Sequence, residues 1–388
     1  MPRIYIVELC NYDDYPVGGH LSFARQLIKA FGNEIALIGI STGDEPVKKW
    51  IKKKIGDVEY DFYSVRKRKK ILTKPIIPLR LQAFLYLSGC RKELAFLSNG
   101  NVFIQTPQVL FALRKLNLEN VCYRLPGVAN ILGASRFWYA KFFKGIYERI
   151  LFSSLSKVKL ILASADQDSI ADFCRRSRNT ISIDRVIRFP TRIDTDVFKP
   201  SGRMDACLKL RSDPQRKRIV TTGRLNQLKG WKFLIDCFVL FINEHPHSDL
   251  YFLGDGEDRM KIENYITEKE MTNHIFITGQ VNPETVALYL NSADLYVMGS
   301  FLEGWSTSLI EAIACAVPVC ITRFSSADEL VSNGYNGYIS DTRDENEFVA
   351  NMNRALKIPK AALLESSGEM NKYSVSRLKE DLLKYWQI

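Results

Sequence analysis

The chain has 388 residues, a length that predicts two or three domains rather than one. Hydrophobic residues make up 46% and charged residues 25%, a balance typical of globular proteins that excludes an intrinsically disordered chain. The net charge of +11 is uneven, since residues 1–200 carry 33 Lys and Arg against 18 Asp and Glu, and the rest carry 21 against 25. This asymmetry predicts two domains with different partners, one of them anionic.

Several protein classes are not indicated. The longest apolar stretches, such as 81–87 and 317–321, are much shorter than the ~20 residues of a membrane span. Residues 1–10 lack the apolar segment of a secretory leader and are interpreted as a first buried strand. The eight cysteines form no Cys-x-x-Cys pair and only four histidines occur, which excludes the common zinc spacings. We therefore expect a reducing compartment, the cytoplasm.

The first forty residues predict a strand, a glycine turn, a helix and a second strand. Residues 4–7 are β-rich, Gly18 and Gly19 break the chain, and apolar residues of 21–31 share one helical face before strand 35–40. Such a β-α-β unit predicts a parallel, doubly wound sheet. Further strands are predicted at 102–104, 121–123, 160–163 and 186–189.

The same alternation starts again after Pro200 and predicts a second βα half that meets the first near 189–203. Its predicted strands are 218–222, 249–253, 275–277, 295–298 and 317–322, and its predicted helices are 231–241, 259–270, 283–290 and 307–315. Residues 374–388 are helical in pattern, with an apolar stripe formed by Leu378, Leu382, Leu383, Tyr385 and Trp386.

Two stretches of the second half carry candidate chemistry. In the first, Ser306 or Thr307 is a natural N-cap, and the free N–H groups of the following helix suit a phosphate or an oxygen-rich ligand. Glu303 precedes that helix and Glu311 lies about one turn inside it, roughly 10 Å away, which suits gripping both sugars of an elongated ligand. Taken alone, the simpler interpretation is that one glutamate favours the positive end of the helix dipole and the other lies on a solvated face.

The second stretch is the loop 223–230, which places Arg224 and Lys229 between two glycines directly after a strand. An Arg fork and a Lys point charge together can neutralise a diphosphate. The Gly-Lys-Ser/Thr order of a P-loop is absent. In isolation, two solvated cations explain the loop as well.

Together these motifs resemble those of the retaining nucleotide-sugar glycosyltransferases of family four. The resemblance rests on Gly-Arg-Leu-x-x-x-Lys-Gly at 223–230, followed by Glu303-Gly304 and Glu311. Companion motifs lie at 193–194, 198–200, 253–256, 259, 279–281, 293–295 and 336–337, with the glycine pair and its helix near the start.

The resemblance implies an α/β fold of the GT-B class, with two facing Rossmann-like domains and the donor held mainly by the second. It implies a domain of residues 1–198 on the acceptor side, a nucleotide-sugar-binding domain of residues 199–372, and a helix of residues 373–388 that crosses back to the first domain. We expect Tyr385 and Trp386 to be buried there against residues of the first two hundred.

By the same resemblance, Arg224 and Lys229 hold the donor diphosphate, Glu303 holds the transferred sugar, and Glu311 holds the ribose. Further expected donor contacts are Gly18, Gly19, Gly223, Gln280, Val281, Gly304, Trp305, Ser306, Thr307 and Ser308. No metal or other cofactor is expected, because two fixed cations and a helix terminus replace it.

On the acceptor side the candidates are Asp13, Asp14 and Arg124. Arg124 stands in a region where many relatives have a histidine. Asp194-Thr195-Asp196 has the Asp-x-Asp pattern of a metal site in the other large glycosyltransferase fold. It lies between the two halves, flanked by prolines, so a turn is the favoured interpretation.

Residues 48–70 contain ten cations against three acids and precede an apolar stretch. This pattern suits contact with an anionic membrane surface, and a solvated charge run is the alternative. No motif supports nucleic-acid binding.

The expected function is transfer of a sugar from a nucleotide donor, most simply a UDP-sugar, to a lipid-linked or cell-surface glycan acceptor at the inner face of the membrane. The alternatives are an epimerase of the same fold and a nucleotide-sugar-binding protein without transfer activity.

Overall fold

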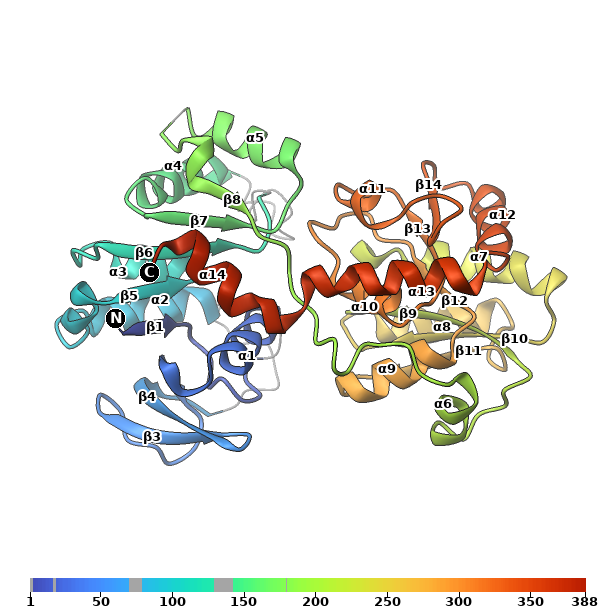
Figure 1. Ribbon diagram of the computed structural model, residues 1–388, viewed down its shortest axis with the longest axis horizontal. Coiled ribbons are helices and arrows are strands. Elements are labelled where there is room, and N and C mark those ends of the chain that lie inside the picture. Colours follow the sequence, from blue (N-terminus) through green and yellow to red (C-terminus); the bar gives the residue numbers. More distant parts are fainter. Residues whose placement is uncertain (1–2, 17–18, 70–78, 129–141, 179) are drawn as a thin grey trace. The chain divides into compact units, whose positions relative to one another are not determined.

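The computed structural model describes residues 3–16, 19–69, 79–128, 142–178 and 180–388 (Figure 1). The chain divides into two compact units, Met1–Arg192 with Val375–Ile388, and Ile193–Ser374. We call them the first and the second unit. The domain borders expected from the sequence were 198/199 and 372/373.

Within its described residues, the first unit is built on an eight-stranded sheet in the order β3-β4-β2-β1-β5-β6-β7-β8. All neighbouring strands are parallel except β3 and β4. The strands are β1 (Ile4–Val7), β2 (Ile35–Ser41), β3 (Trp50–Ile55), β4 (Val58–Lys67), β5 (Asn101–Ile104), β6 (Asn120–Leu125), β7 (Leu160–Ala163) and β8 (Val186–Arg188). The helices are α1 (Gly19–Phe31), α2 (Leu79–Gly89), α3 (Pro107–Leu113), α4 (Lys144–Leu155), α5 (Gln167–Arg176) and α14 (Leu378–Trp386).

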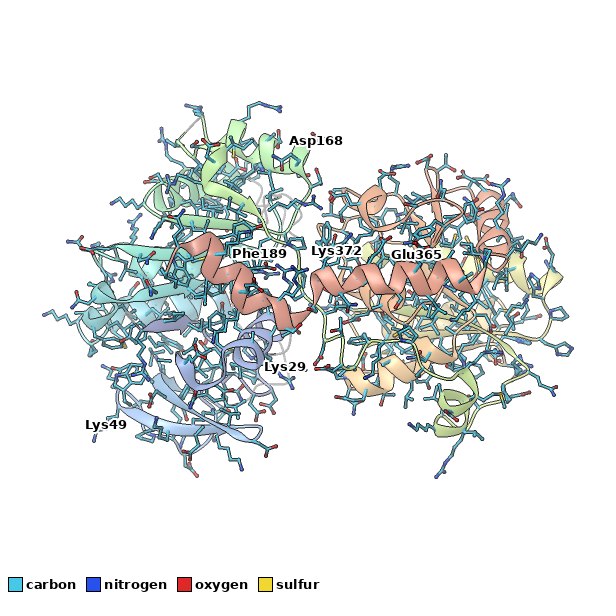
Figure 2. The ribbon with its side chains drawn as sticks, in the orientation of Figure 1. Lys29, Lys49, Asp168, Phe189, Glu365 and Lys372 are labelled. Carbon is cyan, nitrogen blue, oxygen red and sulfur yellow. The ribbon has the colours of Figure 1, made fainter. Side chains whose placement is uncertain are left out.

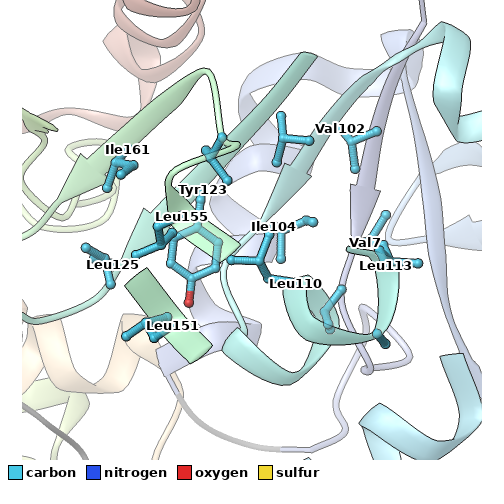
Figure 3. Close-up of a cluster of buried hydrophobic side chains, with 14 of the residues drawn as sticks. Val7, Val102, Ile104, Leu110, Leu113, Tyr123, Leu125, Leu151, Leu155 and Ile161 are labelled. Carbon is cyan, nitrogen blue, oxygen red and sulfur yellow. The ribbon is translucent and has the colours of Figure 1, made fainter. Parts of the chain in front are cut away.

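Side chains that alternate along the strands form a separate core on each face of this sheet. On one face, Val7, Ile104 and Tyr123 pack with Leu151 and Leu155 of α4 (Figure 3). On the other face, Ile6, Phe103 and Cys122 pack against α1 and α14. Burial on both faces explains why these strands are continuous apolar runs in the sequence.

The C-terminal helix α14 packs on the first unit, as the resemblance predicts. Trp386 is fully buried and its indole Nε1 donates to Asn120 Oδ1 at 2.7 Å. Asp381 accepts from Arg192 at 2.7 Å. The expected burial of Tyr385 is wrong, because this residue is 40% exposed. Its ring makes an edge contact with the ring of Phe189, which Figure 2 labels beside α14.

Most of the basic region 48–70 forms a hairpin, β3 and β4, at the edge of the sheet. Much of its charge is neutralised by ion pairs with acidic side chains: Lys48 with Glu93, Lys52 with Asp61, Lys53 with Glu45 and Lys67 with Asp44. Lys49, labelled in Figure 2, is exposed, as are Lys54 and the 39%-exposed Trp50. The positive surface of this hairpin is therefore smaller than the residue count suggests.

The second unit has a six-stranded, all-parallel sheet in the order β11-β10-β9-β12-β13-β14. Its strands are β9 (Lys217–Thr222), β10 (Ser248–Leu253), β11 (Ile275–Gly279), β12 (Leu295–Met298), β13 (Val319–Thr322) and β14 (Gly337–Ser340). Its helices are α6 (Arg203–Lys209), α7 (Trp231–Glu244), α8 (Arg259–Glu268), α9 (Pro283–Ser292), α10 (Thr307–Ala314), α11 (Ala327–Leu330), α12 (Glu345–Ala355) and α13 (Lys360–Glu369). The strand order reverses at β9, which is where ligands of doubly wound sheets bind, beyond the carboxyl ends of the strands.

Candidate functional site

The loops that follow β9 and β10 are bound tightly together at the carboxyl edge of the second sheet. The backbone N–H of Gly223 donates to Leu253 O, and that of Leu225 donates to Asp255 O, both at 3.0 Å. Gly254 has φ +149°, and a Cβ on it would lie 2.0 Å from Gly223 O. Only glycine fits there, so this approach fixes the backbone that presents Arg224.

A small pocket opens at the ends of β9 and β12. Its lining includes Thr222, Gly223, Arg224, Lys229, Met298 and Ser300. Two of the predicted catalytic residues therefore line one pocket at the point where the strand order reverses.

Lys229, predicted to hold the donor diphosphate, and Glu303, predicted to hold the transferred sugar, are in direct contact. Lys229 Nζ lies 2.5 Å from Glu303 Oε1, and Ser300 Oγ donates to the same oxygen at 2.8 Å. Ser326 Oγ donates to Gly304 O at 2.9 Å, which fixes the backbone after the glutamate. In the free protein, the lysine charge is thus neutralised by the carboxylate beside it.

Arg224 is held outward, in a different pair. Its Nε donates to Glu257 Oε2 at 2.9 Å, and its side chain is 67% exposed. Glu257 follows the second glycine of Leu253–Gly256 and was not among the predicted site residues. An anion in the pocket would therefore compete with one carboxylate for Lys229 and with another for Arg224.

The start of α10 is capped as expected. Ser306 is the N-cap, with its Oγ accepting from Leu309 N at 3.3 Å, and Thr307 is the first helical residue. Ser308 Oγ lies 3.2 Å from Ser306 Oγ. The Trp305 side chain packs in the core, 5.4 Å from the Tyr373 ring, so the ring does not face the pocket.

Glu311 lies one turn into α10, and its carboxyl group makes no hydrogen bond or ion pair within the described part of the chain. Burial raises the pKa of its carboxyl to about 8. Tyr296 of β12 is a neighbour that the sequence did not single out. Burial raises the pKa of Tyr296 to about 12, with a contribution from the charges of Glu311 and Glu303. Its hydroxyl lies 3.3 Å from Thr222 Oγ1.

Arg343 is a second residue that sequence reasoning missed. Its two Nη atoms donate to the carbonyls of Gly299 and Ser300 at 3.0 and 2.8 Å, and its guanidinium stacks on Phe301 at 3.5 Å. These contacts hold the segment between β12 and Glu303. Because residue 343 is far along the chain and belongs to no motif, no sequence signal pointed to it.

The other predicted residues are more dispersed. Gln280 and Val281 follow the edge strand β11, where Gln280 is exposed. Gly18 lies outside the described residues, and Gly19 is the first residue of α1. Asp13 and Asp14 are exposed in a turn whose backbone N–H groups donate to Asn11 Oδ1 at 3.0 Å.

Asp194 also lies in a turn, and its Oδ1 accepts from Asp196 N at 3.2 Å. Within the described ranges, no three His, Cys, Asp or Glu side chains are gathered around a possible metal position. Arg124 is buried at the end of β6 in the first unit. Metal independence and the role of Arg124 stay predictions.

The comparison with known families tests the resemblance that the motifs indicate. Residues 208–374, all in the second unit, match the family model described as Glycosyl transferases group 1. The similarity to family-four glycosyltransferases expected from the motifs is confirmed.

Individual relatives agree. The D-inositol 3-phosphate glycosyltransferase of Pseudarthrobacter chlorophenolicus is 28% identical over 162 residues, 41% of this chain and 39% of the relative. The alpha-monoglucosyldiacylglycerol synthase of Acholeplasma laidlawii is 27% identical over 126 residues, 32% of each chain. The chain thus spans well under half of the length of these curated relatives.

A solved structure covers the whole chain. Anabaena HepE in complex with UDP-glucose aligns over 99% of both chains with a TM-score of 0.73 at 15% identity. The fold is therefore GT-B, with a parallel-sheet α/β unit before and after residue 193 and a C-terminal helix on the first. Among the described helices, none combines the length and apolar character needed to cross a membrane.

Proposed function

We propose that this chain is a retaining glycosyltransferase that moves a sugar from a nucleotide-sugar, a UDP-sugar, to a glycan or lipid-linked acceptor without a metal ion. The observation that carries the proposal is the pocket at the reversal point of the second sheet, which Arg224 and Lys229 both line and where Lys229 is paired with Glu303. Relatives matched over part of the chain bear the names of glycosyltransferases, and HepE was solved with UDP-glucose.

The two cations act on the leaving group. As the bond between the anomeric carbon and the phosphate oxygen breaks, negative charge grows on the diphosphate, and fixed charges placed there lower the barrier. Lys229 and Arg224 exchange their carboxylate partners for phosphate oxygens when the donor binds. The new bond forms between the anomeric carbon and an acceptor hydroxyl oxygen, whose proton is released.

The carboxylates act on the sugars. Once Lys229 turns to phosphate, Glu303 is free to accept hydrogen bonds from hydroxyls of the transferred sugar. Glu311, which lacks a hydrogen-bond partner within the described residues, accepts from the ribose diol. The capped start of α10 adds backbone N–H groups and a positive dipole end on the same side.

The acceptor is proposed to be lipid-linked or part of a surface glycan, with the enzyme at the inner membrane face. The name of the glucosyldiacylglycerol synthase supports a lipid acceptor. The hairpin β3–β4 is the proposed membrane contact, through exposed Lys49, Lys54 and Trp50. Each cation near anionic headgroups contributes about 1 kcal/mol. Sedimentation with anionic vesicles should weaken in the double variant Lys49→Glu and Lys54→Glu.

Calorimetry with UDP, GDP and ADP, followed by donor hydrolysis with a panel of sugars on the bound nucleotide, tests the main proposal. Binding of one nucleotide and slow release of sugar from its conjugates are expected, with EDTA without effect. Failure of all nucleotides to bind, or loss of turnover in EDTA with recovery in Mn²⁺, contradicts it.

A further inference from the structure

Arg124 of the first unit is a buried cation that no carboxylate of the described residues pairs with. It is the fifth residue of β6, pairs in register with Leu162 of β7, and is 4% exposed. No acidic side chain forms an ion pair or hydrogen bond with it in the described part of the chain. The residues outside the described ranges include no Asp or Glu.

The hydrogen bonds of the guanidinium are few and long. Its Nη1 lies 3.5 Å from Gln105 Oε1, and its Nη2 lies 3.3 Å from both Ser164 Oγ and Thr191 Oγ1. Its Nε is buried and has no hydrogen-bond partner among the described residues. An arginine has five N–H donors, and bonds to neutral acceptors are normally near 2.9 Å. Much of its hydrogen-bonding capacity is thus unused.

The place of Arg124 in the sheet is one where ligands of doubly wound folds bind. It lies at the carboxyl edge of the sheet, beside β5 and next to the reversal of strand order between β1 and β5. The guanidinium stacks on Phe23 of α1 at 3.8 Å, and Gln105 Nε2 donates to His20 O in the first turn of that helix. Arg124 therefore lies against the first turns of α1.

Burial of an uncompensated charge is unfavourable, and the pKa of Arg124 is lowered to about 9 by burial alone. A structural arginine normally has its charge or its donors satisfied, as Arg343 does with two carbonyls. Arg218 of the second unit is a useful contrast, since it is 3% exposed and, among the described residues, its guanidinium pairs with no carboxylate and its Nε has no hydrogen-bond partner. It stacks on Tyr251 and Tyr289 at the amino end of β9, where ligands do not bind.

We propose that Arg124, with Gln105, Ser164 and Thr191, forms a subsite that binds an anionic group, a phosphate or a carboxylate, on the acceptor. This inference rests on the proposed glycosyl transfer. The planar fork of the guanidinium donates to two oxygens of such a group, and the Thr191 hydroxyl donates to the same oxygens, while Ser164, whose Oγ donates to Phe189 O at 2.9 Å, holds the guanidinium in place. The acceptor would then be an acidic saccharide or a sugar phosphate rather than a neutral sugar.

The test compares binding of a hexose 6-phosphate, a hexuronic acid and the neutral hexose to the full chain by calorimetry, with the donor pocket filled by UDP. The expected result is at least about tenfold tighter binding of one anionic probe, which also decides between phosphate and carboxylate. Arg124→Gln should abolish that preference and Arg124→Lys should keep part of it. The control Arg218→Gln should keep it in full.

A second readout separates binding from folding. Arg124→Gln should not lower the melting temperature of the ligand-free protein, because it removes a buried, uncompensated charge. Equal binding of all three probes to the wild type, or a preference that survives Arg124→Gln, overturns the proposal. A lower melting temperature of Arg124→Gln together with an unchanged preference for the anionic probe also overturns it. UDP binding to the same variants tests the donor site independently. Repeating the probe calorimetry with Lys229→Ala excludes binding of the phosphate probe in the donor pocket.

Discussion

At the scale of single residues, the site is defined by ion pairs that the donor must replace. Lys229 is paired with Glu303 and Arg224 with Glu257, so each cation already has a carboxylate partner in the free protein. These pairs could not be predicted from the sequence. They depend on β9 lying between β10 and β12, which brings residues 74 positions apart into contact.

Lys229→Ala and Arg224→Ala should each reduce the transfer rate by about 10²–10³-fold, because each removes a charge that stabilises the leaving diphosphate. The melting temperature should change little for Arg224→Ala, since exposed ion pairs contribute little to stability. Steady-state kinetics and thermal unfolding measure the two effects. Lys232→Ala is the control, since Lys232 lies on α7 with its Nζ over the Tyr265 ring. Near-normal activity in either variant, or an equal loss in the control, would rule out the clamp.

Glu311 should make nucleoside binding depend on pH. Burial raises the pKa of its carboxyl to about 8, so near pH 6.5 the free protein holds it protonated. A carboxylate accepts two hydrogen bonds from a ribose diol, whereas the protonated acid has one acceptor position fewer. The affinity for uridine, measured by calorimetry, should therefore rise between about pH 6.5 and 8.5, and binding should release a proton.

Glu311→Gln is the matched control, since the amide keeps the shape and does not titrate. The same group affects stability, because the unfolded carboxyl ionises near its model value of 4.5 while the folded one stays protonated to about 8. The free energy of unfolding should thus fall as pH rises through that window, and the variant should lack this contribution. Identical pH profiles for the two proteins would contradict the assignment.

At the scale of elements, apolar runs were sufficient to predict the central strands. β1, β7 and β12 coincide with the predicted residues, because strands buried on both faces consist of continuous apolar residues. The hairpin β3–β4 was missed because three of six residues in β3 are lysines and the region was interpreted as a charge run. The signal was present in the alternation of Ile51, Lys53 and Ile55, of which Lys53 lies over the Phe62 ring.

Gly230 joins the loop 223–230 to α7, and substituting it tests why glycine is needed at this position. Gly230 has φ +66°, and a Cβ on it would lie 1.8 Å from Gly299 O. Gly230→Ala should therefore lower the free energy of unfolding by at least about 2 kcal/mol and weaken UDP binding, since strain and a backbone clash combine. Chemical denaturation and calorimetry measure both.

Gly56→Ala is the matched control, because Gly56 has φ +59° and no atom within 4 Å of the added Cβ. It should lose only about 1 kcal/mol, the cost of the backbone conformation without a clash. Equal losses for the two variants would show that conformation alone, and not the approach to Gly299, requires glycine at 230.

At the scale of the whole molecule, the chain leaves the first unit at Arg192 and returns to it at Val375. The apolar stripe of the last residues predicted that this helix is covered, because exposed aromatic stripes favour association, and the family resemblance implied that it returns to the first domain. The sequence could not show which side chains of that domain it contacts. Leu378, Leu382 and Trp386 complete the core formed by α1 and one face of the first sheet, so the last helix is part of the first unit's interior.

Trp386→Ala should therefore destabilise the first unit and leave the second unit intact. Removing a fully buried Trp costs about 3–5 kcal/mol and also leaves Asn120 Oδ1 without its donor. Differential scanning calorimetry should show a lower melting temperature for one transition, while UDP, whose proposed pocket lies within residues 193–374, should still stabilise the other. Tyr385→Ala is the control on the neighbouring, 40%-exposed residue and should cost about 1 kcal/mol or less. If Trp386→Ala abolished UDP binding while both transitions stayed in place, the helix would serve the donor site rather than the core of the first unit.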